Sequence, residues 1–261
     1  MKTRLLLLAS ALLLSAEMAM AQDYSVPVSE KNEKMMEGKF KPTWESLRNY
    51  KVPEWFRNAK FGIWAHWGPQ CVEGSGDWMA RELYFEGSRA YNHHGHPSEV
   101  GFKDIIPLFK AERWDPYKLV ALYKKIGAQY FFALGNHHDN MDLWDSQYQP
   151  WNSVNMGPKR DILAEWEKAA RKYELPFGIS FHADHAWTWY EPSQRYDREG
   201  PKAGIPYDGK LTKEDGKGKW WEGYDPQDLY AQNHPLSEGS WSNGMIHKQW
   251  AWGKGVCLPT Q

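Results

Sequence analysis

Between residues 115 and 134, a segment with helical spacing is followed directly by a strand-like segment, and the same order recurs further along the chain. Asp115-Pro116 is a typical helix start, with Asp as the N-cap and Pro in the first turn. The helix is predicted to end at Gly127, and its apolar residues have the i, i+3, i+4, i+7 spacing: Leu119, Leu122, Tyr123 and Ile126. Tyr130–Leu134 is a continuous apolar run, as expected of a parallel strand buried on both faces.

A second helical segment starts at Asp161, and it is followed by a second strand-like segment, Phe177–Phe181. The apolar face of its helix is formed by Ile162, Trp166, Ala169 and Tyr173. An earlier strand is predicted at Lys60–His66, and short helices are predicted at Arg81–Phe85 and Asp225–Gln232. Strands alternating with helices at these lengths predict βαβ units, and therefore an α/β fold with a parallel sheet.

The N-terminus has the three regions of a secretory signal peptide. Lys2 and Arg4 precede the apolar run Leu5–Leu14, and Ala19 and Ala21 provide the small residues of a cleavage site. We expect residues 1–21 to be removed and the protein to be exported, to a periplasm or beyond. A retained N-terminal anchor is the alternative, although the run is shorter than the roughly 20 residues that span a bilayer. Residues 22–43 are predicted to form a polar N-terminal arm, and residues 44–261 the folded domain.

Composition favours a carbohydrate as the partner. The chain has 16 Trp and 14 Tyr among 261 residues, and aromatic rings stack on the apolar faces of sugars. With 32 basic and 33 acidic side chains and no basic patch, the sequence argues against a nucleic-acid partner. No further apolar run is long enough for a membrane. Cys71 and Cys257 could pair in an exported protein or remain free thiols, and the sequence leaves both open.

Histidines stand at the ends of all three predicted strands: His66 after the first, His137 and His138 after the second, and His182 after the third. The carboxyl ends of parallel strands meet on one face, so these side chains are predicted to share a site. Imidazoles can hydrogen-bond the hydroxyls of a small polyol. Metal binding is less well supported, because no H-x-x-x-H or H-E-x-x-H spacing occurs and adjacent histidines on an extended chain point to opposite faces. Purely structural histidines are the third interpretation. His93, His94 and His96 lie in a predicted loop with no strand to position them, so we expect them to be solvated or structural.

Several segments together resemble the α-L-fucosidases of glycoside hydrolase family 29. The resemblance covers about residues 44–190. It is carried by Trp55–Gly68 (WFRNAKFGIWAHWG), Asp77–Tyr84 (DWMARELY), Gly127–Asp139 (GAQYFFALGNHHD), Leu143–Tyr148 (LWDSQY), Pro158–Asp161 (PKRD) and Phe177–Ser180 (FGIS). The resemblance implies that this chain is an incomplete (β/α)8 TIM-like barrel, about the first three to four β/α units, with 193–219 as a surface insertion.

The resemblance also implies a function, the retaining hydrolysis of terminal α-L-fucose from fucosylated oligosaccharides or glycoconjugates, without a cofactor or a metal. By the family pattern, His66, His137 and His138 hydrogen-bond the fucose hydroxyls, and Trp78 lies near the sugar. Ser180, Phe181 and His182 stand where the family commonly has Tyr-Tyr-Ser, so His182 is a further candidate for substrate binding.

The catalytic carboxylates are not identified in this sequence. Retaining glycosidases need a nucleophile and an acid/base about 5 Å apart, and no Asp here matches the family's nucleophile motif. We expect both groups beyond Gln261, so that the chain alone would be inactive. Two alternatives stay open: a non-catalytic fucose-binding remnant, and another glycosidase or metal-dependent hydrolase on the same scaffold. The sequence does not determine the oligomeric state.

Overall fold

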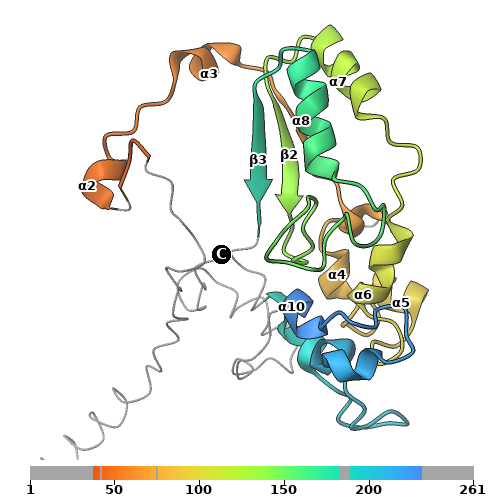
Figure 1. The fold of residues 1–261 in the computed structure, drawn as a ribbon. Coiled ribbons are helices and arrows are strands. Elements are labelled where there is room, and N and C mark those ends of the chain that lie inside the picture. The colour runs from red at the N-terminus through yellow and green to blue at the C-terminus, as the bar shows by residue number, and fades with distance from the viewer. Residues whose placement is uncertain (1–37, 42, 75, 183–188, 231–261) are drawn as a thin grey trace, which may run out of the picture. The chain divides into compact units, whose positions relative to one another are not determined.

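The structure, a computed structural model, describes residues 38–41, 43–74, 76–182 and 189–230. The predicted signal peptide and Cys257 lie outside the described residues, whereas Cys71 is a free, exposed thiol. All elements of the described residues lie in the unit Pro42–Gln261 (Figure 1). The α-helices are α2 Trp44–Leu47, α3 Glu54–Ala59, α4 Met79–Glu82, α5 Arg89–His94, α6 Phe102–Ile105, α7 Pro116–Lys125, α8 Ile162–Lys172 and α10 Pro226–Tyr230. The 3-10 helices are η2 Pro69–Cys71, η3 Ile106–Leu108, η5 Glu191–Gln194, η6 Asp208–Lys210 and η7 Lys213–Gly216.

Three strands form one parallel sheet in the order β1-β2-β3, which confirms the predicted α/β fold. β3, Phe177–Phe181, has the predicted bounds, whereas β2 extends from Phe131 to Asn136 and β1 is only Ile63–Ala65. Ile63 of β1 pairs with Phe131 of β2, which pairs with Phe177 of β3. The pairing is therefore in register at the N-terminal ends of the strands and brings their carboxyl ends to one edge.

The two long helices form where their caps and periodicity predict them. Asp115 caps α7 by accepting a hydrogen bond from the Lys118 amide, and Asp161 caps α8 by accepting one from the Ala164 amide. Gly127 follows α7 with φ +98°, a conformation that favours glycine. The buried face of α8 consists of Ile162, Leu163, Trp166, Ala169 and Ala170.

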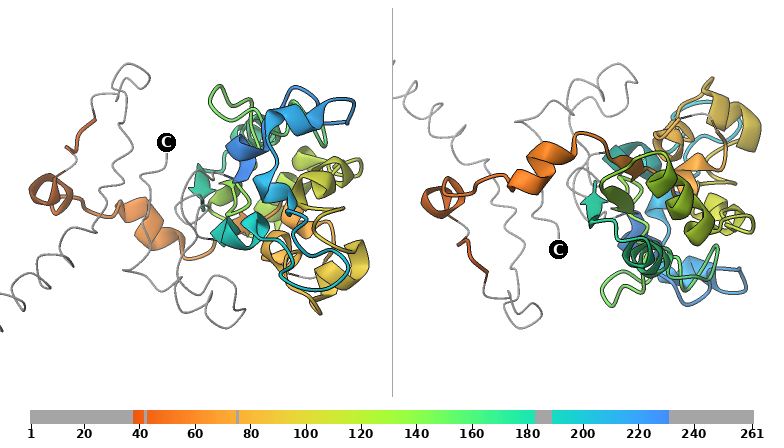
Figure 2. Two further views of the ribbon diagram at one scale, coloured as in Figure 1. Left: turned by 90° about the horizontal axis from the view of Figure 1, so that it is seen from below. Right: turned by 90° about the horizontal axis from the view of Figure 1, so that it is seen from above.

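The helices α7 and α8 lie on the same side of the sheet, as the view along the strands shows (Figure 2). Phe131 and Ala133 of β2 point to this side and are fully buried in a core shared with Val120 of α7 and Trp166 of α8. On the other side of the sheet, Trp64 of β1 is 50% exposed. β2, the strand expected to be buried on both faces, is buried at five of its six residues, whereas no residue of β1 is fully buried.

A second core is built around α4, α5, α6 and α10. It includes part of the segment 193–219, which we predicted to be a surface insertion. That prediction is wrong for its middle: Tyr207 is 9% exposed and Asp208 is 3% exposed. Asp208 accepts hydrogen bonds from the hydroxyls of Tyr84 and Tyr230, so the segment is tied into the core by polar contacts that show no sequence periodicity.

Within the described ranges, no helix combines the length and apolar character needed to cross a bilayer.

Candidate functional site

The four histidines predicted to share a site do lie together at the carboxyl edge of the sheet. The ring of His66 is 5.0 Å from that of His137 and 5.1 Å from that of His182, measured between centroids. His138 is 4.8 Å from His137 and 5.3 Å from His182. We call these four residues the histidine cluster.

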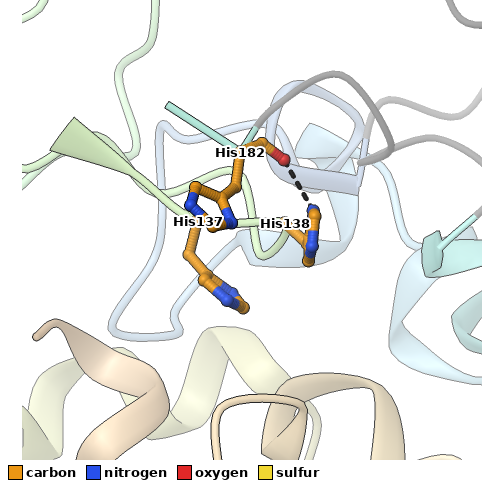
Figure 3. A group of neighbouring side chains, drawn as sticks. All are labelled: His137, His138 and His182. Atoms are coloured by element: carbon orange, nitrogen blue, oxygen red, sulfur yellow. Dashed lines mark hydrogen bonds between the residues drawn. The ribbon is translucent and has the colours of Figure 1, made fainter. Parts of the chain in front are cut away.

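His137 and His138 converge rather than diverge, which contradicts our expectation that adjacent histidines point to opposite faces. The reason is that β2 ends at Asn136, so both residues lie in the turn beyond the strand. The Nδ1 atom of His138 is 2.6 Å from the carbonyl oxygen of His182, as the dashed line in Figure 3 marks. Nδ1 of His138 therefore carries the proton, since a carbonyl can only accept.

The turn that carries His137 and His138 is fixed by hydrogen bonds around its base. The Asn136 amide donates to the Asp142 carboxylate at 2.7 Å, and the Leu143 N–H donates to the Gly135 carbonyl at 2.8 Å. The pairing of β2 with β3 also shifts register between Leu134 and Asn136. A Cβ at Gly135 would come within 2.8 Å of the Phe181 ring, so glycine allows β3 to approach closely at this irregularity.

His137 is the most deeply buried of the four histidines in the cluster. Its side chain is 2% exposed, and neither ring nitrogen has a hydrogen-bond partner among the described residues. Burial, followed by the neighbouring imidazoles of His138, His66 and His182, lowers the pKa of His137 to about 2. His137 is therefore neutral at any physiological pH, with one ring nitrogen able to donate and the other to accept.

Asp77 is a residue of the site that sequence reasoning missed. Its Oδ2 atom is 3.3 Å from Nε2 of His66 and 3.8 Å from Nε2 of His137, although neither contact is a hydrogen bond. The carboxylate is 53% exposed, so it also faces solvent. The signal was available, because Asp77 directly precedes Trp78 in the segment that carries the resemblance.

Trp78 connects to the histidine cluster through Asp77. It precedes α4 and packs, partly buried, against the second core.

Two other indoles touch the histidine cluster and were also missed by sequence reasoning. Trp64 donates from Nε1 to the Ser180 hydroxyl at 2.9 Å and has its ring 4.6 Å from His66. The buried Trp189 has its ring 5.6 Å from His138.

Asp139, next to the cluster, is placed to order the turn. Its side chain is fully buried and accepts a hydrogen bond from the Met141 N–H, and its carbonyl oxygen accepts one from the Tyr190 hydroxyl. Burial, followed by the charge of Asp142, raises the pKa of Asp139 to about 7. A carboxyl group without solvent access is poorly placed to attack a substrate.

The cluster also brings together donors that could hold a metal. The ring nitrogens of His137, His138 and His182 can lie within 4.8 Å of one another, as can donor atoms of His66, Asp77 and His137. The absence of H-x-x-x-H and H-E-x-x-H motifs is therefore weak evidence against a metal site, because these candidate ligands come from different strand ends. The same ring nitrogens and the Asp77 carboxylate could equally form hydrogen bonds with the hydroxyls of a sugar, because each hydroxyl can both donate and accept.

Comparison with known proteins identifies the family. The family model described as alpha-L-fucosidase matches residues 28–257. The chain belongs to the alpha-L-fucosidase family.

Curated relatives support this assignment. The chain is 34% identical over 164 residues to the plasma alpha-L-fucosidase of Homo sapiens, a match that covers 59% of this chain and 34% of the relative. It is 30% identical over 215 residues to the alpha-L-fucosidase of Branchiostoma floridae, covering 79% of this chain and 44% of the relative. The chain therefore spans about a third to under a half of the length of these relatives.

Solved structures agree. The alpha-fucosidase of Thermotoga maritima, in complex with a mechanism-based inhibitor, superposes with a TM-score of 0.51 at 37% identity, covering 54% of this chain and 37% of that one. An alpha-L-fucosynthase from Thermotoga maritima gives a TM-score of 0.51 at 35% identity, covering 56% of this chain and 38% of that one.

The low pKa of His137 predicts a specific dependence of stability on pH. Below pH 6.5 the unfolded chain protonates this histidine and the folded chain does not, so folding loses free energy as the pH falls. The variant His137→Gln lacks this loss. Between pH 7.5 and 5, its free energy of unfolding should therefore gain about 2 kcal/mol relative to that of the parent protein.

Urea denaturation at both pH values measures this difference. Leu122→Ala, a change at a half-exposed position on α7 without an ionisable group, serves as the control, and its difference from the parent should not vary with pH. If the His137→Gln difference is also constant with pH, His137 titrates normally in the folded protein.

Proposed function

We propose that this protein is an exported, retaining α-L-fucosidase that releases terminal α-L-fucose from fucosylated oligosaccharides or glycoconjugates. The observation that carries the proposal is the convergence of four imidazoles from three strand ends, with the nitrogens of His66 and His137 unpaired among the described residues. Membership of the family and the names of the relatives support it.

In this proposal, His66, His137 and His138 hydrogen-bond the fucose hydroxyls. His137 is held neutral, so it can both donate to one hydroxyl and accept from another. Nδ1 of His138 donates to the His182 carbonyl, which fixes the orientation of the ring beside His137. His182 lies where its own ring can contact the same sugar, and Trp64 and Trp78 supply apolar surface for the ring. The proposed binding requires neither metal nor cofactor.

We also propose that the sheet is the first part of a (β/α)8 barrel. Two features support this. The crossover helices α7 and α8 cover the same face of a parallel sheet, as in a barrel, whereas a doubly wound sheet has helices on both faces. The other face exposes Trp64, an apolar side chain that a closed barrel would bury. A structure of the complete protein with helices on both faces would contradict this.

The chemistry would follow the retaining scheme. A carboxylate attacks the anomeric carbon while a carboxylic acid protonates the departing oxygen, and water then releases fucose from the covalent intermediate. We propose that the two carboxyl groups come from the part of the relatives' length that this chain does not span. Contacts from the histidine cluster that strengthen as positive charge develops on the ring would accelerate the reaction.

The activity prediction concerns His66 and His137. With the protein produced from its complete reading frame, p-nitrophenyl α-L-fucoside should be hydrolysed. His66→Ala and His137→Ala should each lower kcat/KM roughly 10- to 100-fold, because a lost hydrogen bond at a buried site costs about 1–3 kcal/mol. Lys118→Ala, at a side chain 87% exposed on α7, is the control and should leave the rate unchanged.

Hydrolysis that is insensitive to both histidine substitutions would place the substrate elsewhere. A folded protein that binds L-fucose but releases no p-nitrophenol would favour the non-catalytic alternative.

Retention predicts the anomer of the first product. Proton NMR during the first minutes of hydrolysis should show α-L-fucose before mutarotation produces the β-anomer, because two displacements at the anomeric carbon restore its configuration. Appearance of the β-anomer first would indicate a single displacement and exclude the retaining mechanism.

Export predicts cleavage after Ala21, because Ala19 and Ala21 form the small-residue site behind the apolar run. N-terminal sequencing of the protein recovered outside the cytoplasm should begin at Gln22. An intact Met1 on the mature protein would contradict cleavage and support a retained anchor.

A further inference from the structure

A second group of histidines lies outside the histidine cluster, at the contact between α5 and the segment that follows η2. Nε2 of His94 is 2.6 Å from Oε1 of Glu73, and Nε2 of His93 is 3.9 Å from the same oxygen. The two imidazole rings meet edge to face, with their centroids 4.7 Å apart. From sequence, His93 and His94 are expected to be solvated or structural. The structure makes them two nitrogen donors that point to one carboxylate.

Two members of this group are held in place by burial. The side chains of Glu73 and His94 are 9% and 10% exposed, and the hydrogen bond between them keeps both polar ends together. The helix that carries the histidines is short but fixed at both ends. The Ser88 hydroxyl caps it by accepting from the Tyr91 N–H, and the N–H of Gly95 bonds the Tyr91 carbonyl. His93, by contrast, is 66% exposed, which leaves solvent access from that side.

The distances between the donor atoms of this group lie on either side of the distance between neighbouring ligands of a coordinated zinc ion. Zinc bonds of about 2.0–2.1 Å to nitrogen and oxygen place neighbouring tetrahedral ligands about 3.3–3.4 Å apart. The two separations from Glu73 Oε1 lie on either side of this value, and all three donor atoms fall within 4.8 Å of one another. Small side-chain rotations, which exposed His93 is free to make, would bring the three donors to the vertices of one tetrahedron.

The donor set selects among metals. Two imidazoles and one carboxylate suit zinc and other first-row divalent ions, whereas magnesium and calcium prefer oxygen ligands. A simple hydrogen bond between His94 and Glu73 would explain the burial of those two residues. It would not explain why the second imidazole, on the adjacent residue, presents the same nitrogen to the same oxygen.

We propose that Glu73, His93 and His94 bind a zinc ion, with solvent as the fourth ligand. The ion would fasten α5 to the segment after η2. Glu73 is four residues before Asp77, so this fastening would also restrain the start of the segment that brings Asp77 to the histidine cluster. This zinc site is separate from the proposed sugar site, and its test does not depend on fucosidase activity.

Isothermal titration of the tag-free, metal-stripped protein with zinc chloride tests the proposal. We expect one ion to bind. His93→Ala and Glu73→Gln should each weaken zinc binding by about tenfold or more, since substitution even of residues that only orient the ligands lowers metal affinity roughly 10- to 100-fold. His93 is exposed and Glu73→Gln keeps the side-chain shape, so both variants should fold. Asn92→Ala, at an exposed residue of the same helix, is the matched control and should bind like the parent.

Crystals soaked in zinc chloride locate the ion directly. The proposal expects an anomalous peak at the zinc edge within bonding distance of all three side chains. No zinc binding, equal affinity in His93→Ala and the parent, or a peak only at the histidine cluster would each overturn it.

Discussion

Parallel pairing of three short strands is the constraint on which the site depends. Ile63, Phe131 and Phe177 are aligned across the sheet and the strands run parallel, so their carboxyl ends all lie at one edge. His66, His137 and His182, which are distant along the chain, are thereby brought within about 5 Å of one another. The buried apolar contacts of α7 and α8 with β2 hold this alignment, so the core on one face of the sheet maintains the geometry at its edge.

Burying imidazoles together has a cost that points to a function. Charged neighbours would repel, and His137 responds by remaining neutral with a pKa of about 2. Its ring nitrogens and those of His66 have no hydrogen-bond partner among the described residues, and buried polar groups without hydrogen bonds cost free energy. A ligand rich in hydroxyl groups would satisfy them. The cluster is thus more costly to keep than a structural core would require, and this cost is expected of a binding site.

Local signals predicted much of the fold. The bounds of α7 and α8 followed from the Asp caps and apolar spacing, and β3 was predicted to the residue, since each of these depends on neighbouring residues in sequence. The grouping of the four histidines also followed, because it requires only that parallel strands end together. By contrast, Asp77 reaches His66 through a loop, and Tyr84 meets Asp208 across the second core. Such tertiary contacts have no period in the sequence. The convergence of His137 and His138 was missed because it depends on where β2 ends.

The central claim is that the histidine cluster binds the fucose ring. A crystal structure of the protein soaked with L-fucose tests this most directly. The account predicts the sugar at the carboxyl edge of the sheet, with hydroxyls within hydrogen-bonding distance of ring nitrogens of His66, His137 and His138. Fucose bound elsewhere, or a metal ion held by these nitrogens in place of the sugar, would contradict it.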